Sequence, residues 1–313
     1  MRKILVLLLL AGLSFHTVFS QITEGEASLR KQRTDTVSGW KKGAVVGVNV
    51  SQASLTNWAA GGQNSFGING LTSLFANYKK GKMAWDNSLD IGYGLLKQGA
   101  NSDFIKTDDR FDLFSKYGQQ ASKSLYYAAL FNFKTQMTEG KDYARDTAKI
   151  SNLLAPAYVL TAIGLDYKPN SYFTAFLAPL TGKVTIVNDT ALSNKGAFGV
   201  TPGEKFKGEF GGYLRAGFTK NDFKTEVLKN FSLTTKLDLF SNYLHRPQDI
   251  DVSWETIFVF KVNKYITVNL NTHLIYDADI LFDTNDDGQI TAGVDKSLVQ
   301  FKEILGVGFM YKF

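Results

Sequence analysis

The chain has 313 residues, of which 44% are hydrophobic, 20% charged and 13% aromatic. It contains no cysteine, which excludes disulfides, thiolate metal sites, cysteine nucleophiles and lipidation of an N-terminal cysteine, and its three histidines make a multi-histidine zinc site improbable. The 35 basic and 29 acidic residues are scattered in ones and twos, without the basic clusters and interleaved aromatic residues of a nucleic-acid surface.

The first 40 residues read as two segments. Arg2 and Lys3 are followed by an apolar run over 4–13 and a small residue, Ser20, before Gln21. This pattern predicts a cleaved signal peptide over 1–20. The alternative is an uncleaved anchor, but the run is short against the roughly 20 apolar residues of a membrane span. Residues 21–40 are polar and predict a flexible periplasmic arm.

From there to the end, apolar and polar residues alternate with period two, which is typical of strands. The clearest case sets Trp254, Phe258 and Phe260 on one face against Glu255 and Lys261 on the other. We expect twelve strands, at 43–52, 65–78, 83–96, 108–117, 123–137, 157–167, 171–187, 204–219, 224–243, 249–262, 265–277 and 297–313.

The expected connectors differ in length from one end of the strands to the other. Those after the second, fourth, sixth and tenth strands are short, and those after the first, third, fifth, seventh and eleventh are longer; the ninth is a modest exception. A two-sheet sandwich would also alternate, but it has no reason to sort its loops. Sorted loops are typical of an outer-membrane barrel with periplasmic turns and extracellular loops. We therefore predict an all-β fold: one antiparallel transmembrane barrel over 41–313, with both termini in the periplasm.

The aromatic residues fit this prediction. The following lie near expected strand ends, where aromatic girdles meet the lipid boundary, although each alone could be a core residue: Trp85, Tyr93, Tyr127, Tyr167, Trp254 and Tyr276. The last strand carries Leu305, Val307, Phe309, Tyr311 and ends on Phe313. This resembles the signal by which barrel-assembly machinery recognises its clients.

Several stretches resemble a family of Gram-negative outer-membrane proteins catalogued as domain of unknown function 3078. They are residues 55–62 (LTNWAAGG), 85–89 (WDNSL), 178–183 (APLTGK), 239–243 (LFSNY) and 276–279 (YDAD). The resemblance implies a cell-envelope β-protein with no assigned reaction and no catalytic residues to transfer.

One acidic segment is a candidate calcium loop. Asp283, Asn285, Asp287 and Gln289 have the spacing of the first half of such a loop, with Gly288 at the turn position. Position twelve is Val294 rather than the bidentate Glu, and Asp295 is the candidate substitute. The alternative is a plain acidic turn. Such an ion would be structural, and we expect no other cofactor.

The faces expected to line the interior carry charges of both signs in similar numbers. They are Asp86, Asp90, Lys134, Lys207, Glu209, Arg215, Lys236, Asp238, Asp251, Glu255, Lys261 and Lys302. Inside a narrow barrel such groups must pair or stay hydrated. We favour a cross-lumen network of ion pairs over a polar conduit, because the lining is not biased to one sign.

Two further features bear on function. His273, with Asn269 and Asn271 on its face and Ser232 or Thr234 as a hydroxyl, would suit a hydrolase, but no catalytic sequence signature accompanies it. Asn57 and Trp58 lie in a glycine-rich loop that could dock a partner.

We predict a non-enzymatic protein of the outer membrane, in contact with its lipid, that serves interaction or assembly, with another envelope protein as partner and no nucleic acid. The alternatives are narrow or lateral-opening transport of a small solute and, second, a lipid hydrolase.

Overall fold

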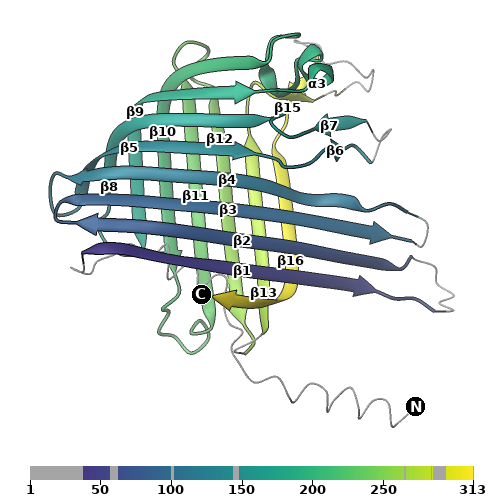
Figure 1. The fold of residues 1–313 in the computed structure, drawn as a ribbon, viewed down its shortest axis with the longest axis horizontal. Coiled ribbons are helices and arrows are strands. Elements are labelled where there is room, and N and C mark those ends of the chain that lie inside the picture. The colour runs from purple at the N-terminus through teal and green to yellow at the C-terminus, as the bar shows by residue number, and fades with distance from the viewer. Residues whose placement is uncertain are drawn as a thin grey trace.

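The computed structural model describes residues 38–56, 63–99, 102–143, 148–263, 266–282, 284 and 294–312, and only the backbone over 309–312. Within these residues twelve strands pair in sequence order into one closed antiparallel barrel, which confirms the predicted fold (Figure 1). The strands are β1 (Gly39–Ala53), β2 (Ser65–Lys80), β3 (Met83–Gln98), β4 (Ile105–Gln120), β5 (Leu125–Thr135), β8 (Ala157–Tyr167), β9 (Phe173–Ile186), β10 (Phe206–Lys220), β11 (Phe231–Asn242), β12 (Ile250–Lys261), β13 (Ile266–Tyr276) and β16 (Gln300–Lys312).

The barrel closes where β1 meets β16. The register sets Val45 opposite Lys312 and Asn49 opposite Gly308. In Figure 1 the strands of the near wall, β1 to β5, run across those of the far wall, β10 to β12, as expected when all strands tilt against the barrel axis. Closure gives the sheet no free outer edge strand, which is the condition for a sheet to stand in lipid.

The expected strand boundaries hold to within a few residues, with one larger difference. The ninth strand was expected over 224–243, but β11 begins only at Phe231. Residues 221–230 instead form turns, with Leu228 N–H bonded to Thr225 O and Phe231 N–H bonded to Leu228 O. Val227 is 82% exposed there. The connector from β10 to β11 is therefore long, although it lies at the end where the other connectors are short. At the start of the barrel, Gly39 and Trp40 belong to β1 rather than to the arm.

The two faces of the wall separate as predicted. Outward side chains are large, apolar and exposed, as in Ile163 and Leu165 of β8 and Leu305 and Val307 of β16. Across the first four strands, an aromatic row lies in direct register near the short-turn end: Trp40, Tyr78, Trp85 and Tyr117. The ring centres of Trp40 lie 5.1 Å from Tyr78 and 5.7 Å from Trp85. An apolar wall with such a row fits the boundary between hydrocarbon and water.

Inside the lumen, an apolar cluster packs against one part of the wall. Ala128, Leu130, Ala162, Phe176 and Phe240 form a buried cluster with Ala178 and Tyr213, contributed by β5, β8, β9, β10 and β11. The same strands also carry interior charges, among them Lys134, Asp166 and Asp238. Apolar and charged side chains therefore share this part of the lumen.

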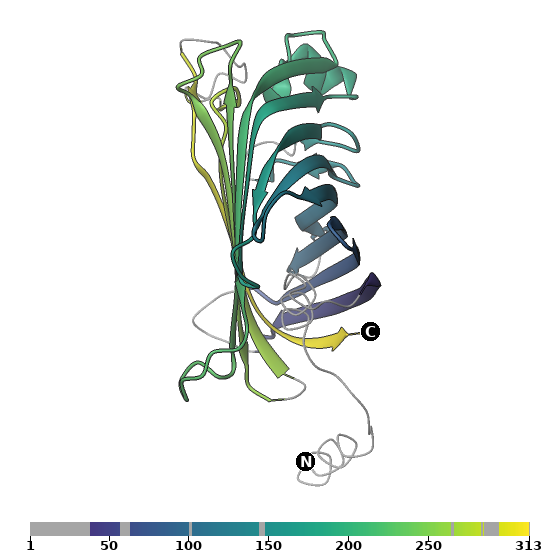
Figure 2. The ribbon, with the colours of Figure 1, turned by 90° about the vertical axis from the view of Figure 1, so that its left-hand side faces the viewer.

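The long-loop end carries small elements that the sequence did not predict. They are the hairpins β6 (Gly140–Lys141) with β7 (Lys149–Ser151) and β14 (Leu281–Phe282) with β15 (Lys296–Ser297), helix α3 (Thr190–Asn194) and the 3-10 turn η1 (Ala197–Gly199). Figure 2 shows α3 above the strand ends. Among the described residues, no helix has the length and apolarity needed to cross a membrane.

These elements form a lid over the long-loop end, built from β7, α3 and η1. Asp189 caps α3 by accepting hydrogen bonds from the N–H groups of Ala191 and Leu192, and it also accepts one from Lys149 Nζ at 2.5 Å. A small apolar core holds the segment, with Val187, Leu192 and Val200 buried. The lid is thus held together by packing and by the carboxylate of Asp189, which joins α3 to β7.

Candidate functional site in the barrel lumen

The charged side chains of the lumen meet in pairs, many of them between strands that are not neighbours. Arg110 on β4 contacts Glu255 on β12, and these two strands stand opposite one another in the closed ring. Lys236 Nζ lies 3.5 Å from the other oxygen of Glu255. The predicted cross-lumen network is therefore present, since this pair spans the full width of the interior.

A second group of charges lies beside this pair. Arg215 makes a two-point contact with Asp238, at 2.6 and 2.9 Å, and the Tyr213 hydroxyl donates to the same carboxylate at 2.5 Å. Lys134 bridges Asp238 and Asp112 at 3.8 and 3.9 Å. We call the whole set, Arg110, Asp112, Lys134, Arg215, Lys236, Asp238 and Glu255, the ionic belt.

The ionic belt stands between two cavities. The outer chamber, of about 1290 Å³, is lined by lid and barrel residues that include Phe198, Leu160 and Ile275. The inner chamber, of about 480 Å³, is lined by residues of the short-turn end such as Lys123 and Tyr172. Belt residues line both: Lys134 and Asp238 the outer, and Asp112, Arg215 and Lys236 the inner. Belt residues therefore stand at the level between the two spaces.

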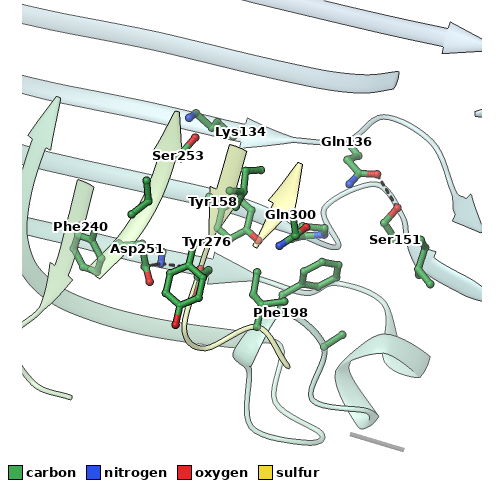
Figure 3. A pocket seen from close by; sticks show the side chains of 18 of the residues that line it. Lys134, Gln136, Ser151, Tyr158, Phe198, Phe240, Asp251, Ser253, Tyr276 and Gln300 are labelled. Carbon is green, nitrogen blue, oxygen red and sulfur yellow. Dashed lines mark hydrogen bonds and ion pairs between the residues drawn. The ribbon is translucent and has the colours of Figure 1, made fainter. Parts of the chain in front are cut away.

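The outer chamber is amphipathic. Apolar side chains come from the lid and from the strands, among them Leu160, Phe198, Phe240 and Phe282. Figure 3 shows Tyr158, Phe198 and Phe240 around the same space as Asp251 and Lys134. Phe198 is held at a φ of 60°, in the left-handed region that bulky residues rarely adopt. The lid thus accepts backbone strain at a residue that forms the chamber wall.

A third set of charges lies in the wall of the outer chamber. Lys183 on β9 lies 2.6 Å from Asp251, 3.4 Å from Glu209 and 3.5 Å from Asp277. Lys207 lies 2.5 Å from Asp279 and 3.6 Å from Glu209. We call these six residues the Lys183 cluster.

Below the belt, the inner chamber is closed by a smaller network. Asp166 accepts contacts from Lys116 at 2.8 Å and from Lys168 at 3.2 Å, and Lys168 also reaches Asp86 at 2.8 Å. Lys168 lies in the short turn after β8 and Asp86 lies on β3, three strands away around the ring, so this network ties a turn to a non-neighbouring strand. Each end of the lumen is therefore braced by ion pairs.

Sequence reasoning found most of these charges but not all. Predicted interior residues make ion pairs or hydrogen bonds within the lumen, as Asp90 does with Ser73 and Lys302 with Asp108. It missed the residues at the centre of the networks, Arg110 and Lys183, and also Asp112, Lys116 and Asp166. The signal for three of them was present, because Arg110, Asp112 and Lys116 share one face of β4 by period-two spacing.

The other candidate sites fare differently. Asp283, Asn285, Asp287 and Gln289 of the calcium loop lie outside the described residues, as do Asn57 and Trp58. Asp295 is described: it is 6% exposed and accepts a hydrogen bond from Thr284 N–H at 2.8 Å. Among the described residues no three or more His, Asp or Glu side chains are placed so that they could hold a metal ion together. The calcium site stays a prediction.

His273 points into the outer chamber, as the alternation predicted. Its Nε2 is hydrogen bonded to Ser253 Oγ at 2.9 Å, so its hydroxyl partner is Ser253 rather than Ser232 or Thr234, which are each 2% exposed. Asn269 donates to Asn49 and Thr267. The arrangement does not place either asparagine of the predicted hydrolase set in a hydrogen bond with the imidazole.

A closed antiparallel barrel with an exposed apolar outer wall and a paired, charged interior defines an outer-membrane β-barrel protein. The protein is accordingly placed in the outer membrane, in contact with its lipid. More particularly, residues 50–140 match the profile of a family described as "Protein of unknown function (DUF3078)", which confirms the resemblance over that part of the chain.

Three solved structures share the barrel architecture. The COG4313 outer membrane channel from Pseudomonas putida F1 aligns at 9% identity and a TM-score of 0.39, covering 89% of this chain and 97% of that one. The translocator domain of autotransporter NalP from Neisseria meningitidis aligns at 12% identity and a TM-score of 0.34, covering 93% of this chain and 92% of that one. Outer membrane phospholipase A from Escherichia coli aligns at 10% identity and a TM-score of 0.36, covering 93% of this chain and 98% of that one. Likenesses this distant carry no argument about activity. A comparison with curated proteins gives no match.

Proposed function

We propose that the protein is a non-enzymatic barrel that takes an amphipathic small molecule into its outer chamber from the long-loop side. The observation that carries this proposal is the chamber itself, about 1290 Å³ of space with apolar side chains from lid and wall above a charged belt. Ligand sites are typically cavities of about 300–1000 Å³ lined mainly by apolar and aromatic groups with a few placed polar ones. The chamber exceeds that range and leaves room for an extended molecule.

The ionic belt supports capture rather than free diffusion. Its contacts cross the lumen between β4 and β12 and between β5 and β11, so a solute in the outer chamber meets paired charges before the inner one. Opening this path requires separating pairs with little access to water, which is costly. We therefore expect a barrel that binds its ligand while conducting few ions.

Other roles expected from the sequence stay predictions. Docking of an envelope partner depends on Asn57 and Trp58, which lie outside the described residues. Recognition by barrel-assembly machinery is supported by the outward row on β16, where Leu305 is 66% and Val307 58% exposed. A lipid hydrolase would rest on the Ser253–His273 pair alone.

The test is calorimetric titration of octanol into the protein in lipid nanodiscs, with empty nanodiscs as reference. Ile275 faces the chamber, and its neighbour Leu274 belongs to the alternate, outer face of β13. Ile275→Trp should fill the chamber and weaken binding at least about tenfold, which is 1.4 kcal/mol. Leu274→Trp should leave binding unchanged. Equal binding by both variants and the parent would refute the proposal.

Planar bilayers supply an independent measurement. The parent protein should pass little current, because the belt closes the lumen. Large, steady single-channel conductance would show an open pore and would contradict the capture model, whatever the calorimetry gives.

A further inference from the structure

The Lys183 cluster carries more negative than positive charge, and three of its members, Lys183, Asp251 and Asp277, line the outer chamber. It contains two ammonium groups, those of Lys183 and Lys207, and four carboxylates, those of Glu209, Asp251, Asp277 and Asp279. With all six ionised the formal charge is −2. The side chains are largely withdrawn from water, with Glu209 1%, Lys183 11% and Asp277 13% exposed. Excess negative charge at such a place is costly unless a proton or another cation neutralises it.

The other charges around the chamber do not neutralise this excess. Lys134 is placed between the belt carboxylates Asp112 and Asp238, and Lys149 is paired with Asp189 of the lid. Lys195 and Asp142, also in the lining, have opposite signs. The imbalance is therefore confined to the Lys183 cluster.

One carboxylate oxygen of the cluster lacks a hydrogen bond. Glu209 is 6% exposed, and its Oε1 accepts from Asn242, while its Oε2 has no hydrogen-bond partner within the described part of the chain. That oxygen faces Lys183 Nζ at 3.4 Å, beyond the usual length of a charge-assisted hydrogen bond. A buried carboxylate oxygen in this state has capacity for a further donor.

Aromatic rings accompany the cluster. Lys183 Nζ lies 5.0 Å from the ring centre of Phe240. Figure 3 shows Tyr158, Tyr276 and Phe240 around Asp251, at the edge of the chamber. Ring faces attract organic cations, and carboxylates with aromatic neighbours are a frequent way to hold an ammonium group.

We propose that the Lys183 cluster binds the cationic head of an amphipathic amine whose apolar part occupies the chamber. The inference rests on the proposed function and names the chemical class of its ligand. The head would neutralise part of the excess charge of Asp251 and Asp277, which line the chamber, while the tail would contact Leu160, Phe198 and Phe282.

The experiment compares three probes with one tail: octylamine in its protonated form, octanoate and octanol. Each is titrated calorimetrically at pH 7 into the protein in nanodiscs and into empty nanodiscs. Octylammonium should bind at least about tenfold more tightly than octanol, and octanoate more weakly than octanol, since a unit charge near a site of −2 interacts by several kcal/mol at short range even at an effective dielectric constant of 20.

Asp251→Asn/Asp277→Asn removes the excess charge while keeping side-chain shape. The variant should bring octylammonium affinity to within about threefold of that for octanol and leave octanol itself unchanged. Asp277→Asn alone, which changes a residue just beyond β13, keeps the test available if the double variant fails to fold. The matched control is Asp249→Asn, whose carboxylate is paired with Arg246 on a connector outside the chamber lining.

The outcomes separate the two proposals. Equal binding of all three probes, unchanged in the Asp251 and Asp277 variants, would overturn the cation assignment and leave capture of amphiphiles standing. Absence of binding by every probe would overturn the proposed function itself. An equal loss of octylammonium binding in Asp249→Asn would show a long-range charge effect and would also overturn the assignment.

Discussion

The contact between Arg110 and Glu255 gives the most direct test of the closed lumen. The two side chains are 23% and 13% exposed, and they join opposite walls of the barrel. Removing one partner of a buried pair costs about 3–5 kcal/mol. Both groups keep some access to water, and Glu255 would still have Lys236 Nζ at 3.5 Å. We therefore expect Arg110→Met to lower the free energy of unfolding by about 3 kcal/mol, the low end of this range.

The assay is a double-mutant cycle with Glu255→Gln. Unfolding by urea in lipid vesicles is followed by tryptophan fluorescence and by heat-modifiable migration on gels. Glu255→Gln alone should cost about 2 kcal/mol, and the double variant no more than Arg110→Met alone, so the coupling energy should be about 2 kcal/mol. Lys229→Met is the control, because its pair with Glu226 is 56% and 86% exposed and should contribute less than about 0.5 kcal/mol. Additive single costs would mean that the two side chains do not meet across the lumen.

Four further predictions concern the wall, the lid and the loop between β14 and β15. Gly164→Ala should abolish heat-modifiable migration, because a Cβ would lie 2.0 Å from Leu177 O, whereas Gly208→Ala, with nothing within 4 Å, should fold normally. Asp189→Ala should destabilise the lid by about 1 kcal/mol and speed proteolysis within 187–205, and Asp189→Asn, which keeps the cap but loses the charge, should have a smaller effect. The hydrogen bond from Lys149 lowers the pKa of Asp189 from 3.8 to about 2, so its stabilisation is complete above pH 4 to 5 and is lost as the pH falls toward 2. Parent cleavage rates, read with a protease active at both values, should therefore match at pH 5 and pH 7. If the loop between β14 and β15 binds calcium, chelation should increase nicking there, and an unchanged pattern would remove that hypothesis.

The fold was predictable from sequence because every strand of a barrel wall follows the same alternation of side chains. Period-two alternation separates lipid-facing from interior residues on every strand, and it placed Trp254 outside and Glu255 inside correctly. The rule failed over 224–230, where Val227 and Leu228 mimic a strand but belong to turns. Local pattern cannot tell an exposed apolar residue in lipid from one in a connector.

The site was less accessible to sequence reasoning. Alternation shows that Arg110 faces inward, but its contact with Glu255 depends on which strands stand opposite and at what height, and tilt and stagger around the whole ring set both. Lys183 was missed for a related reason, since its three carboxylate neighbours come from β10, β12 and the segment after β13. The amino-acid sequence shows which face of a strand a side chain occupies, but it does not show the distance between side chains on opposite walls of the lumen.

The junction of β1 with β16 has a consequence for biogenesis. Residues 45–49 find their partners only at 308–312, so the ring cannot close until these two distant segments of the chain have met. Until then β1 has an unpaired backbone edge, and such an edge is a template for pairing with other polypeptide chains. Contacts between such distant segments form slowly. Closure therefore satisfies the last unpaired backbone edges of β1 and β16 in a single step.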